Sequence, residues 1–253
     1  MATVVFERSN KQVLLTEDGL EVIERAKSIL LEVDSLLSFT SEHVAPLSGK
    51  ITLGAIPTIS PFMLPAFLPK LRKSYPDLSL LIQERQTALL LNDLRQGRID
   101  AALIALPYPA DDLCTIPLFD DAFFLACHKD HPLAKKKSIR LSDMKEQKLL
   151  LLEEGHCIRD HALSACKMTG GSYSVPFEGT SLQTLLQMVA NEIGLTLIPA
   201  MSINTGFHRI KNIKIIPFKD ESVRRSIGLV YRSTSTKRND ILLLADEIKK
   251  YSL

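Results

Sequence analysis

The first sustained pattern in the chain is an apolar seam along the stretch that follows Thr16. Apolar side chains recur there at alternating spacings of three and four residues, as on one face of a coiled-coil helix. They are Ile23, Ala26, Leu30, Val33 and Leu37. Thr16 is placed to cap this helix, and Glu17 and Asp18 face the positive end of its dipole. The pattern predicts a long helix whose seam packs on a partner helix or on the body of the same chain.

Residues 41–49 break the helical pattern. They are small and polar and are interrupted by Pro46, which is typical of a linker. We therefore expect a domain boundary near residues 45–50.

Beyond the linker, short apolar runs alternate with amphipathic stretches. Strands are expected at residues 51–56, 78–83 and 101–106, and helices at residues 61–74 and 88–96. This βαβαβ order predicts one α/β lobe with a mainly parallel sheet, complete by about residue 120.

A second series of elements follows. Strands are expected at residues 122–127, 149–152, 195–198 and 213–217, and helices from about residue 157 and at residues 181–191. The strand 227–231 and the helix 237–250 have no further sheet to join, so we expect them to complete the first lobe. The lobes are then residues 50–121 with 227–253, and residues 122–226. Two crossing segments would form a cleft that can hinge.

Composition and charge narrow the class of protein. Hydrophobic residues make up 45% of the chain and charged residues 24%, as in globular proteins, and the net charge of +2 does not itself indicate nucleic-acid binding. The first twenty residues have no export signal, and no apolar run is long enough for a membrane helix. We expect a cytoplasmic protein with no membrane partner. Its four cysteines are expected to be free thiols, and any disulfide among them would be a signal or a reaction intermediate.

Cys157 is the strongest candidate for chemistry. It follows a buried strand and the polar stretch 153–156, and it opens a helical pattern. A helix start favours the thiolate, and Arg159 or a protonated His156 could add to the effect. Peroxide would convert such a thiolate to a sulfenic acid, and Cys166 is the nearest thiol in sequence that could capture it.

Cys166 lies nine positions after Cys157, which is about 13 Å along a helix, whereas a disulfide needs Cα atoms within about 7 Å. A disulfide between Cys157 and Cys166 would therefore require the helix to unwind. The alternative is that both cysteines are small buried apolar side chains. A zinc site made by these cysteines with His156 and His161 is a weaker alternative, because structural zinc sites use closely spaced cysteine pairs. Cys114 and Cys127 are expected to be inert.

Three further residues are ambiguous. Thr58 and Thr87 each follow a predicted strand, where α/β proteins bind ligands, but either hydroxyl could simply cap the next helix. Arg225 follows Arg224 at the start of a predicted strand, and such a pair is usually solvated. The chain has no phosphate-binding loop, no dinucleotide fingerprint and no Ser/His/Asp signature, so we expect no cofactor, no metal and no enzyme activity of those classes.

Longer motifs carry a resemblance over nearly the whole chain. Residues 6–19 with the following helix, and residues 49–57, are similar to the wing, linker helix and effector-domain start of LysR-type transcriptional regulators. Residues 152–160, 180–184, 194–199 and 224–232 resemble the peroxide-sensing members of that family. The resemblance implies a two-lobed, periplasmic-binding-protein-like effector region, preceded by a wing remnant at residues 1–15 and a linker or dimerisation helix and hinge at residues 16–49.

The same resemblance assigns roles. Cys157 would be the peroxidatic cysteine and Cys166 the resolving cysteine, while Thr58, Thr87, His156 and Arg225 would surround the peroxide. It also implies a homodimer or homotetramer, promoter DNA, RNA polymerase and a glutaredoxin-type reductant as partners, and regulation of antioxidant genes. The family's helix-turn-helix precedes the wing, so the chain as given is expected to sense without reading DNA sequence.

Other functions remain open at this point. A related regulator that answers a small metabolite would use the cleft as its ligand site, with incidental cysteines. A thiol peroxidase is disfavoured by the fold pattern and by the regulator-like first residues. A solute-binding protein is disfavoured by the missing export signal and by the linker helix.

Overall fold

The computed structural model describes residues 4–9, 12–39, 45–160, 163, 177–206 and 209–252. It begins with an antiparallel hairpin, β1 (Phe6–Ser9) and β2 (Gln12–Leu15), followed by the long helix α1 (Glu17–Phe39). The Thr16 hydroxyl accepts the backbone N–H of Gly19 at 2.9 Å, which confirms the predicted cap. None of the described helices is both long and apolar enough to cross a membrane.

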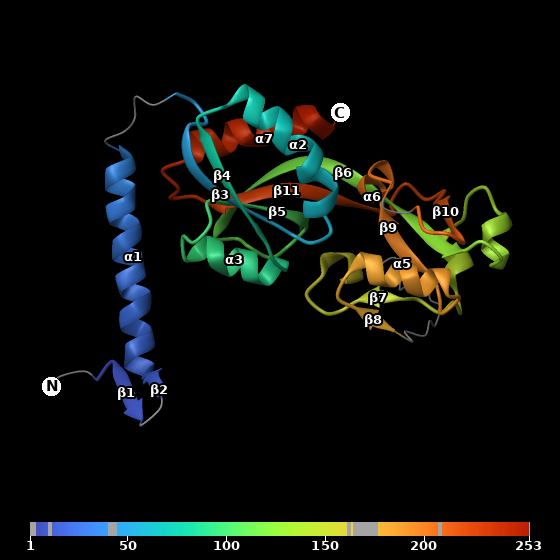
Figure 1. The fold of residues 1–253 in the computed structure, drawn as a ribbon, viewed down its shortest axis with the longest axis horizontal. Coiled ribbons are helices and arrows are strands. Elements are labelled where there is room, and N and C mark those ends of the chain that lie inside the picture. Colours follow the sequence, from blue (N-terminus) through green and yellow to red (C-terminus); the bar gives the residue numbers. More distant parts are fainter. Residues whose placement is uncertain are drawn as a thin grey trace.

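Helix α1 stands apart from the rest of the molecule (Figure 1). Two members of the predicted seam, Leu30 and Val33, are 63% and 47% exposed. Packing of these two side chains on the body of the same chain, one of the two alternatives, is therefore wrong in this structure.

The first half of the body contains the predicted βαβαβ unit. Its strands are β3 (Gly49–Ala55), β4 (Leu78–Glu84) and β5 (Ala101–Leu106), and its helices are α2 (Ser60–Ser74) and α3 (Thr87–Arg95). Strand β3 pairs in parallel with both β4 and β5, as predicted. Helices α2 and α7 (Arg238–Ser252) cover one face of this sheet and α3 covers the other (Figure 1).

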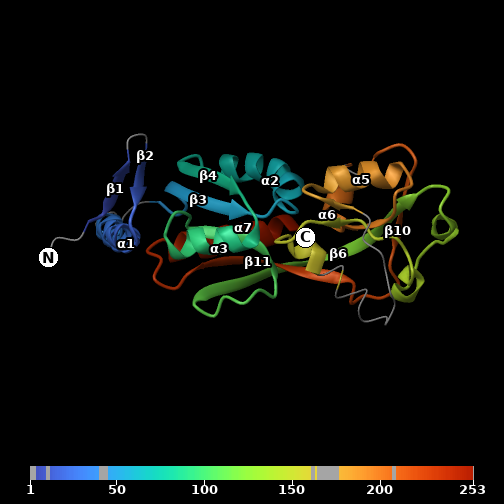
Figure 2. The same ribbon diagram turned by 90° about the horizontal axis from the view of Figure 1, so that it is seen from below.

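Two antiparallel strands connect the halves of the body. Strand β11 (Arg224–Arg232) lies between β5 and the 16-residue strand β6 (Leu113–His128), and both strands run from one half into the other (Figure 2). The predicted strand at residues 122–127 was too short. Many side chains of β6 before residue 121 are only partly buried or exposed, so no continuous apolar run marks that portion.

The predicted mainly parallel sheet is limited to β3, β4 and β5, because β11 pairs antiparallel with β5 and with β6. The second half is mostly antiparallel. Strand β6 pairs there with β9 (Thr196–Pro199) and β10 (Ile213–Pro217). The other elements are η1 (Pro132–Lys135), η2 (Leu141–Met144), β7 (Leu151–Leu152), β8 (Glu178–Gly179), α5 (Leu182–Ala190) and α6 (Ala200–Asn204).

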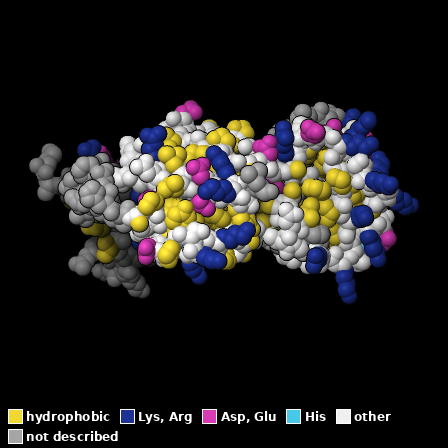
Figure 3. All heavy atoms as spheres, turned by 90° about the horizontal axis from the view of Figure 1, so that it is seen from above, with side chains coloured by type: hydrophobic (Ala, Val, Ile, Leu, Met, Phe, Trp, Pro, Cys, Tyr) yellow, Lys and Arg dark blue, Asp and Glu magenta, His cyan; other side chains and the backbone are white. Residues whose placement is uncertain are grey.

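Buried apolar side chains form two separate clusters. The first core includes Leu53, Leu103, Leu229 and Leu244, and the second core includes Leu125, Leu150, Leu186 and Ile198. Met201 packs against both. The surface narrows between the two halves (Figure 3). This arrangement confirms the predicted two-lobed α/β fold, while the residue ranges assigned to each lobe stay a prediction.

Candidate functional site

Cys157 lies where the two cores meet. Strand β7 of the second half leads through residues 153–156 into a helical turn that begins at Cys157, as predicted. The Cys157 side chain is only 9% exposed, and it packs in the first core although the segment before it packs in the second. A movement of Cys157 would therefore alter the packing of both cores.

Thr87 is the direct partner of Cys157. The Thr87 Oγ1 and Cys157 Sγ atoms are 2.8 Å apart, and either atom can be the donor. Helix α3 has Gln86 as its N-cap residue and no side-chain cap bond, so Thr87 does not cap the helix. With the side chain buried, the Thr87 hydroxyl is held against the thiol.

Gln86 is a site residue that the sequence did not single out. Its Nε2 atom donates to Glu153 Oε1 and to the backbone oxygen of Glu154, each at 3.3 Å. Gly155 in the same loop has φ +91°, and a Cβ atom there would lie 2.6 Å from Gln86 Oε1. The loop before Cys157 therefore rests on the start of α3. Only the tertiary fold brings these two segments together.

Arg225 and Thr58 form a second buried pair. The Arg225 Nη1 atom donates to Thr58 Oγ1 at 2.7 Å, and Nη2 donates to the Thr58 backbone oxygen at 2.9 Å. Arg225 is 1% exposed, so a solvated arginine pair is the wrong interpretation for it. The Thr58 hydroxyl holds the guanidinium and makes no cap bond to α2.

Asp121 is the acidic partner of Arg225, and sequence reasoning missed it. The two residues are register partners in β6 and β11, and Asp121 Oδ2 lies 3.0 Å from Arg225 Nη2 and 3.1 Å from Nε. The other carboxylate oxygen accepts the backbone N–H of Met201 at 3.1 Å. Predicting this pair would have required the register of two strands about 100 residues apart.

The charges of Arg225, Asp121 and a Cys157 thiolate affect one another. Burial lowers the pKa of Arg225, whereas Asp121 and the negative charge of a Cys157 thiolate raise it. Burial also raises the pKa of Asp121, and the Arg225 charge opposes that effect. The Arg225 charge would therefore attract a negative charge on the Cys157 sulfur.

The structure gives the surroundings of His156 and Arg159, the two side chains expected to add to the reactivity of Cys157. His156 is 5% exposed, and burial lowers its pKa, with the charge of Glu153 opposing the effect. Its imidazole is thus biased toward the neutral form, so a protonated His156 beside the thiol is wrong near neutral pH. Arg159 donates to the Leu152 backbone oxygen at 3.1 Å and to Glu178 Oε1 at 2.6 Å.

A small cavity of about 130 Å³ opens beside Cys157. Its other lining residues are Ala88, Pro107, Tyr108, Gly155 and Asp160. It gives a small solute a route toward the buried sulfur. None of the four residues expected around the peroxide, Thr58, Thr87, His156 and Arg225, is among its lining residues.

The remaining cysteines differ from Cys157. Cys127 is buried in β6, and burial raises its pKa to about 11, which makes its thiol unreactive near neutral pH. Cys114 is partly buried. Cys166 and His161 lie outside the described residues, so neither the disulfide nor the alternative zinc site is tested by the geometry.

Comparison with known proteins agrees with this architecture. The LysR substrate binding domain family matches residues 45–252. The hydrogen peroxide-inducible genes activator of Pectobacterium carotovorum subsp. carotovorum is 36% identical over 251 residues, covering 99% of this chain and 83% of that protein. The DNA-binding transcriptional dual regulator OxyR of Escherichia coli K12 is 35% identical, covering 98% of this chain and 81% of that protein.

Solved structures give the same result. A hydrogen peroxide-bound cysteine mutant of Corynebacterium glutamicum OxyR superposes with a TM-score of 0.80 at 33% identity, covering 98% of this chain and 79% of that one. The reduced regulatory domain of Pseudomonas aeruginosa OxyR has a TM-score of 0.74 at 35% identity, covering 83% of this chain and 99% of that one. The chain therefore belongs to the LysR-type regulators and, within them, to the OxyR family of hydrogen peroxide-inducible gene activators.

Proposed function

We propose that this chain senses hydrogen peroxide through Cys157 and regulates transcription in response. The observation that carries the proposal is the buried contact between the Cys157 thiol and the Thr87 hydroxyl. The positive charge of Arg225 also favours a negative charge on the Cys157 sulfur. A thiol at a helix start and near a fixed positive charge has the environment of a reactive cysteine. Relatives named for hydrogen peroxide induction support the choice of oxidant.

The chemistry is a two-electron oxidation of two thiols. The Cys157 thiolate attacks one oxygen of hydrogen peroxide, an S–O bond forms as the O–O bond breaks, and hydroxide leaves. The Cys166 thiolate then attacks the sulfenic sulfur, an S–S bond forms, and a second hydroxide leaves. After protonation, one peroxide yields two water molecules. A glutaredoxin-type reductant would reduce the disulfide back to the two thiols.

The polar residues around Cys157 would assist the first step. The Thr87 hydroxyl can donate to the thiolate or to the peroxide oxygen that keeps the negative charge. Arg225, held by Thr58 and Asp121, supplies a fixed positive charge. A neutral His156 can still exchange a hydrogen bond with the peroxide.

Disulfide formation would change the structure. Cys157 would have to leave Thr87 and the first core to meet a partner nine residues later, so the helical turn at Cys157 would unwind. Because this segment joins both cores, its rearrangement would alter how the two halves pack. That change is the signal to the rest of the assembly.

The assembly would form through α1. The exposed Leu30 and Val33 would pack against the same helix of a second copy, giving a homodimer and, through further contacts, a homotetramer. The Escherichia coli relative is named as a DNA-binding regulator, so we infer promoter DNA and RNA polymerase as partners of the whole protein, in the cytoplasm. We further propose the lobe division at residues 121 and 226, next to Asp121 and Arg225.

The test is thiol mapping by mass spectrometry after about one equivalent of peroxide, applied to the wild-type chain and to Cys166→Ser and Cys114→Ser variants. We expect a Cys157–Cys166 disulfide in the wild type and in Cys114→Ser, and a trapped sulfenic acid on Cys157 in Cys166→Ser. An unreactive Cys157 in the reduced protein would refute the mechanism and favour a metabolite-responsive regulator.

A further inference from the structure

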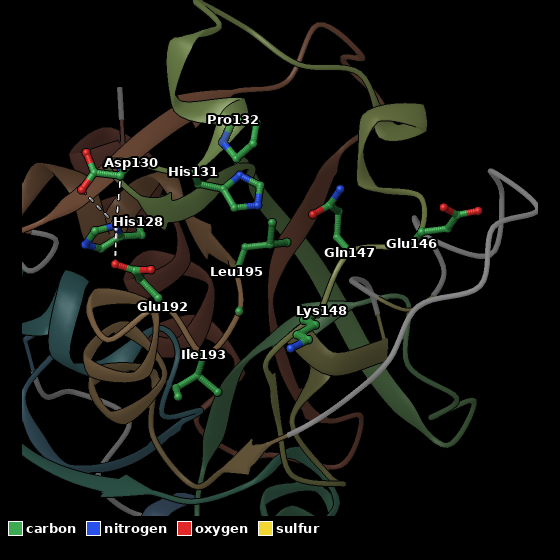
Figure 4. A pocket seen from close by; sticks show the side chains of 11 residues that line it. His128, Asp130, His131, Pro132, Glu146, Gln147, Lys148, Glu192, Ile193 and Leu195 are labelled. Carbon is green, nitrogen blue, oxygen red and sulfur yellow. Dashed lines mark hydrogen bonds and ion pairs between the residues drawn. The ribbon is translucent and has the colours of Figure 1, made fainter.

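A second polar site lies in the other half of the body, at the end of β6. A pocket of about 410 Å³ opens there, and it shares no lining residue with the cavity beside Cys157. Its lining includes His128, Asp130 and Glu192 (Figure 4).

These three side chains converge on one point. The Nδ1 atom of His128 lies 3.4 Å from Glu192 Oε1 and 3.7 Å from Asp130 Oδ2, and both carboxylates point toward the imidazole in Figure 4. All three ligand atoms lie within 4.8 Å of one another. His128 is 7% exposed, so the surrounding structure holds the ring in place.

The residues come from separate elements that the fold brings together. His128 is the last residue of β6, and Asp130 follows two residues later in the turn before η1. Glu192 follows the end of α5 and has φ +62°, a left-handed conformation that a non-glycine residue adopts only when its surroundings hold it there. No metal site was expected from the sequence, in which Glu192 lies 62 positions after Asp130.

The spacing suits a metal ion. In a tetrahedral zinc site with bonds of about 2.0–2.1 Å, neighbouring ligand atoms are about 3.3 Å apart. The two distances from Nδ1, 3.4 and 3.7 Å, are close to that value. The backbone N–H of Asp130 donates to His128 Nδ1 over 3.4 Å, so this nitrogen carries a lone pair rather than a proton, as a metal ligand must. A cation bound at Nδ1 would replace this long hydrogen bond. A bound cation would relieve the repulsion among these three groups.

We propose that His128, Asp130 and Glu192 form a binding site for a divalent cation of the zinc type. One nitrogen and two oxygens would provide three ligands, and water from the adjoining pocket would complete the coordination. The carboxylates are 72% and 70% exposed, which leaves an entry path for the ion. The ion would tie the turn after β6 to the turn after α5. This proposal is independent of the peroxide-sensing mechanism.

The competing explanation is a proton. An imidazole protonated on Nδ1 would pair with the same carboxylates and would need no metal. The two explanations predict different behaviour when zinc is added, because only the metal site gains stability from it.

The test is calorimetric titration of the reduced, metal-free protein with zinc near neutral pH, alongside Asp130→Asn, Glu192→Gln and a matched Glu221→Gln control. Glu221 is exposed and lies outside the cluster, so its substitution removes the same charge without removing a ligand. We expect one site per chain, at least about tenfold weaker in each cluster variant and unchanged in the control. Melting temperatures without zinc verify that each variant folds.

Cobalt substitution identifies the ligands, because zinc also binds thiols. Nitrogen and oxygen ligands give a cobalt spectrum without the intense band that thiolate ligands produce. A thiolate band, equal affinity in the wild type and both cluster variants, equal weakening in the control, or no zinc binding at micromolar concentration would each overturn the proposal.

Discussion

The Sγ atom of Cys157 lies 2.8 Å from the Oγ1 atom of Thr87, and this contact joins the segment leaving the second core to the first turn of α3 on the first core. A thiol in that position cannot form a disulfide with a distant cysteine and also keep its contact. The bond that would sense peroxide therefore competes with a contact between the two halves.

Thr87→Val removes the hydroxyl and keeps the shape of the side chain. We expect the reaction of Cys157 with peroxide to slow by roughly 10- to 100-fold, because a donor to the developing negative charge is lost. Thr87→Ser should restore most of the rate. The control is Thr196→Val, which removes a buried hydroxyl bonded to the Leu150 backbone oxygen in the second core. Stopped-flow measurement of thiol loss checks this, and equal rates in wild type and Thr87→Val would contradict a role for the hydroxyl.

Arg225→Met leaves the buried carboxylate of Asp121 without its partner. We expect a loss of about 3–5 kcal/mol in the free energy of unfolding, because an uncompensated charge stays buried. Arg224→Met is the matched control: its pair with Asp120, at 3.5 Å, is about half exposed, and its removal should cost less than about 1 kcal/mol.

Urea unfolding measures both changes. The double variant Arg225→Met with Asp121→Leu should recover part of the stability lost in Arg225→Met, because no lone charge remains. If Arg225→Met and Arg224→Met lose the same free energy of unfolding, the buried pair stabilises the protein no more than the exposed pair does.

His156 should make the folded state more sensitive to acid. Its pKa is lowered in the folded protein, so below its ordinary value of 6.5 the unfolded chain takes up a proton that the buried imidazole resists. Stability attributable to His156 is therefore complete above pH 6.5 and falls as the pH drops toward the folded pKa.

The check is the difference in unfolding free energy between about pH 7.5 and pH 5, measured for wild type and for His156→Gln. We expect a smaller pH dependence in the variant, and other titrating groups cancel in the comparison. A larger or equal dependence would mean that His156 is not held neutral.

Gly155→Ala should disturb the loop before Cys157. Alanine is strained in the left-handed backbone conformation at φ +91°, and its Cβ atom would lie 2.6 Å from Gln86 Oε1. We expect a loss of about 1–3 kcal/mol in the free energy of unfolding. Slower oxidation of Cys157 should accompany it.

Gly49→Ala separates strain from contact. Gly49 has φ +77°, but nothing lies within 4 Å of an added Cβ. We expect that variant to lose stability while Cys157 reacts with peroxide at the wild-type rate. If both variants slow the reaction equally, the Gln86 contact does not position the thiol.

The local sequence was enough to predict the secondary-structure elements whose formation depends on residues close together in the chain. The Thr16 cap, the parallel unit of β3, β4 and β5, the strand β10 and the helical start at Cys157 follow from propensity, capping and periodicity, which act over a few residues. The functional motifs were also visible, because longer stretches resemble a known family.

The tertiary structure alone decided which side chains meet. Asp121 pairs with Arg225 through strand register, and Gln86 supports the loop at Gly155. His128 meets Glu192 through the packing of two distant turns. Thr58 and Thr87 could each have capped a helix. In the folded protein the Thr58 hydroxyl instead accepts from Arg225, and the Thr87 hydroxyl contacts the Cys157 thiol. Such pairings depend on contacts between residues far apart in the chain, and periodicity, which acts over only a few residues, cannot encode them.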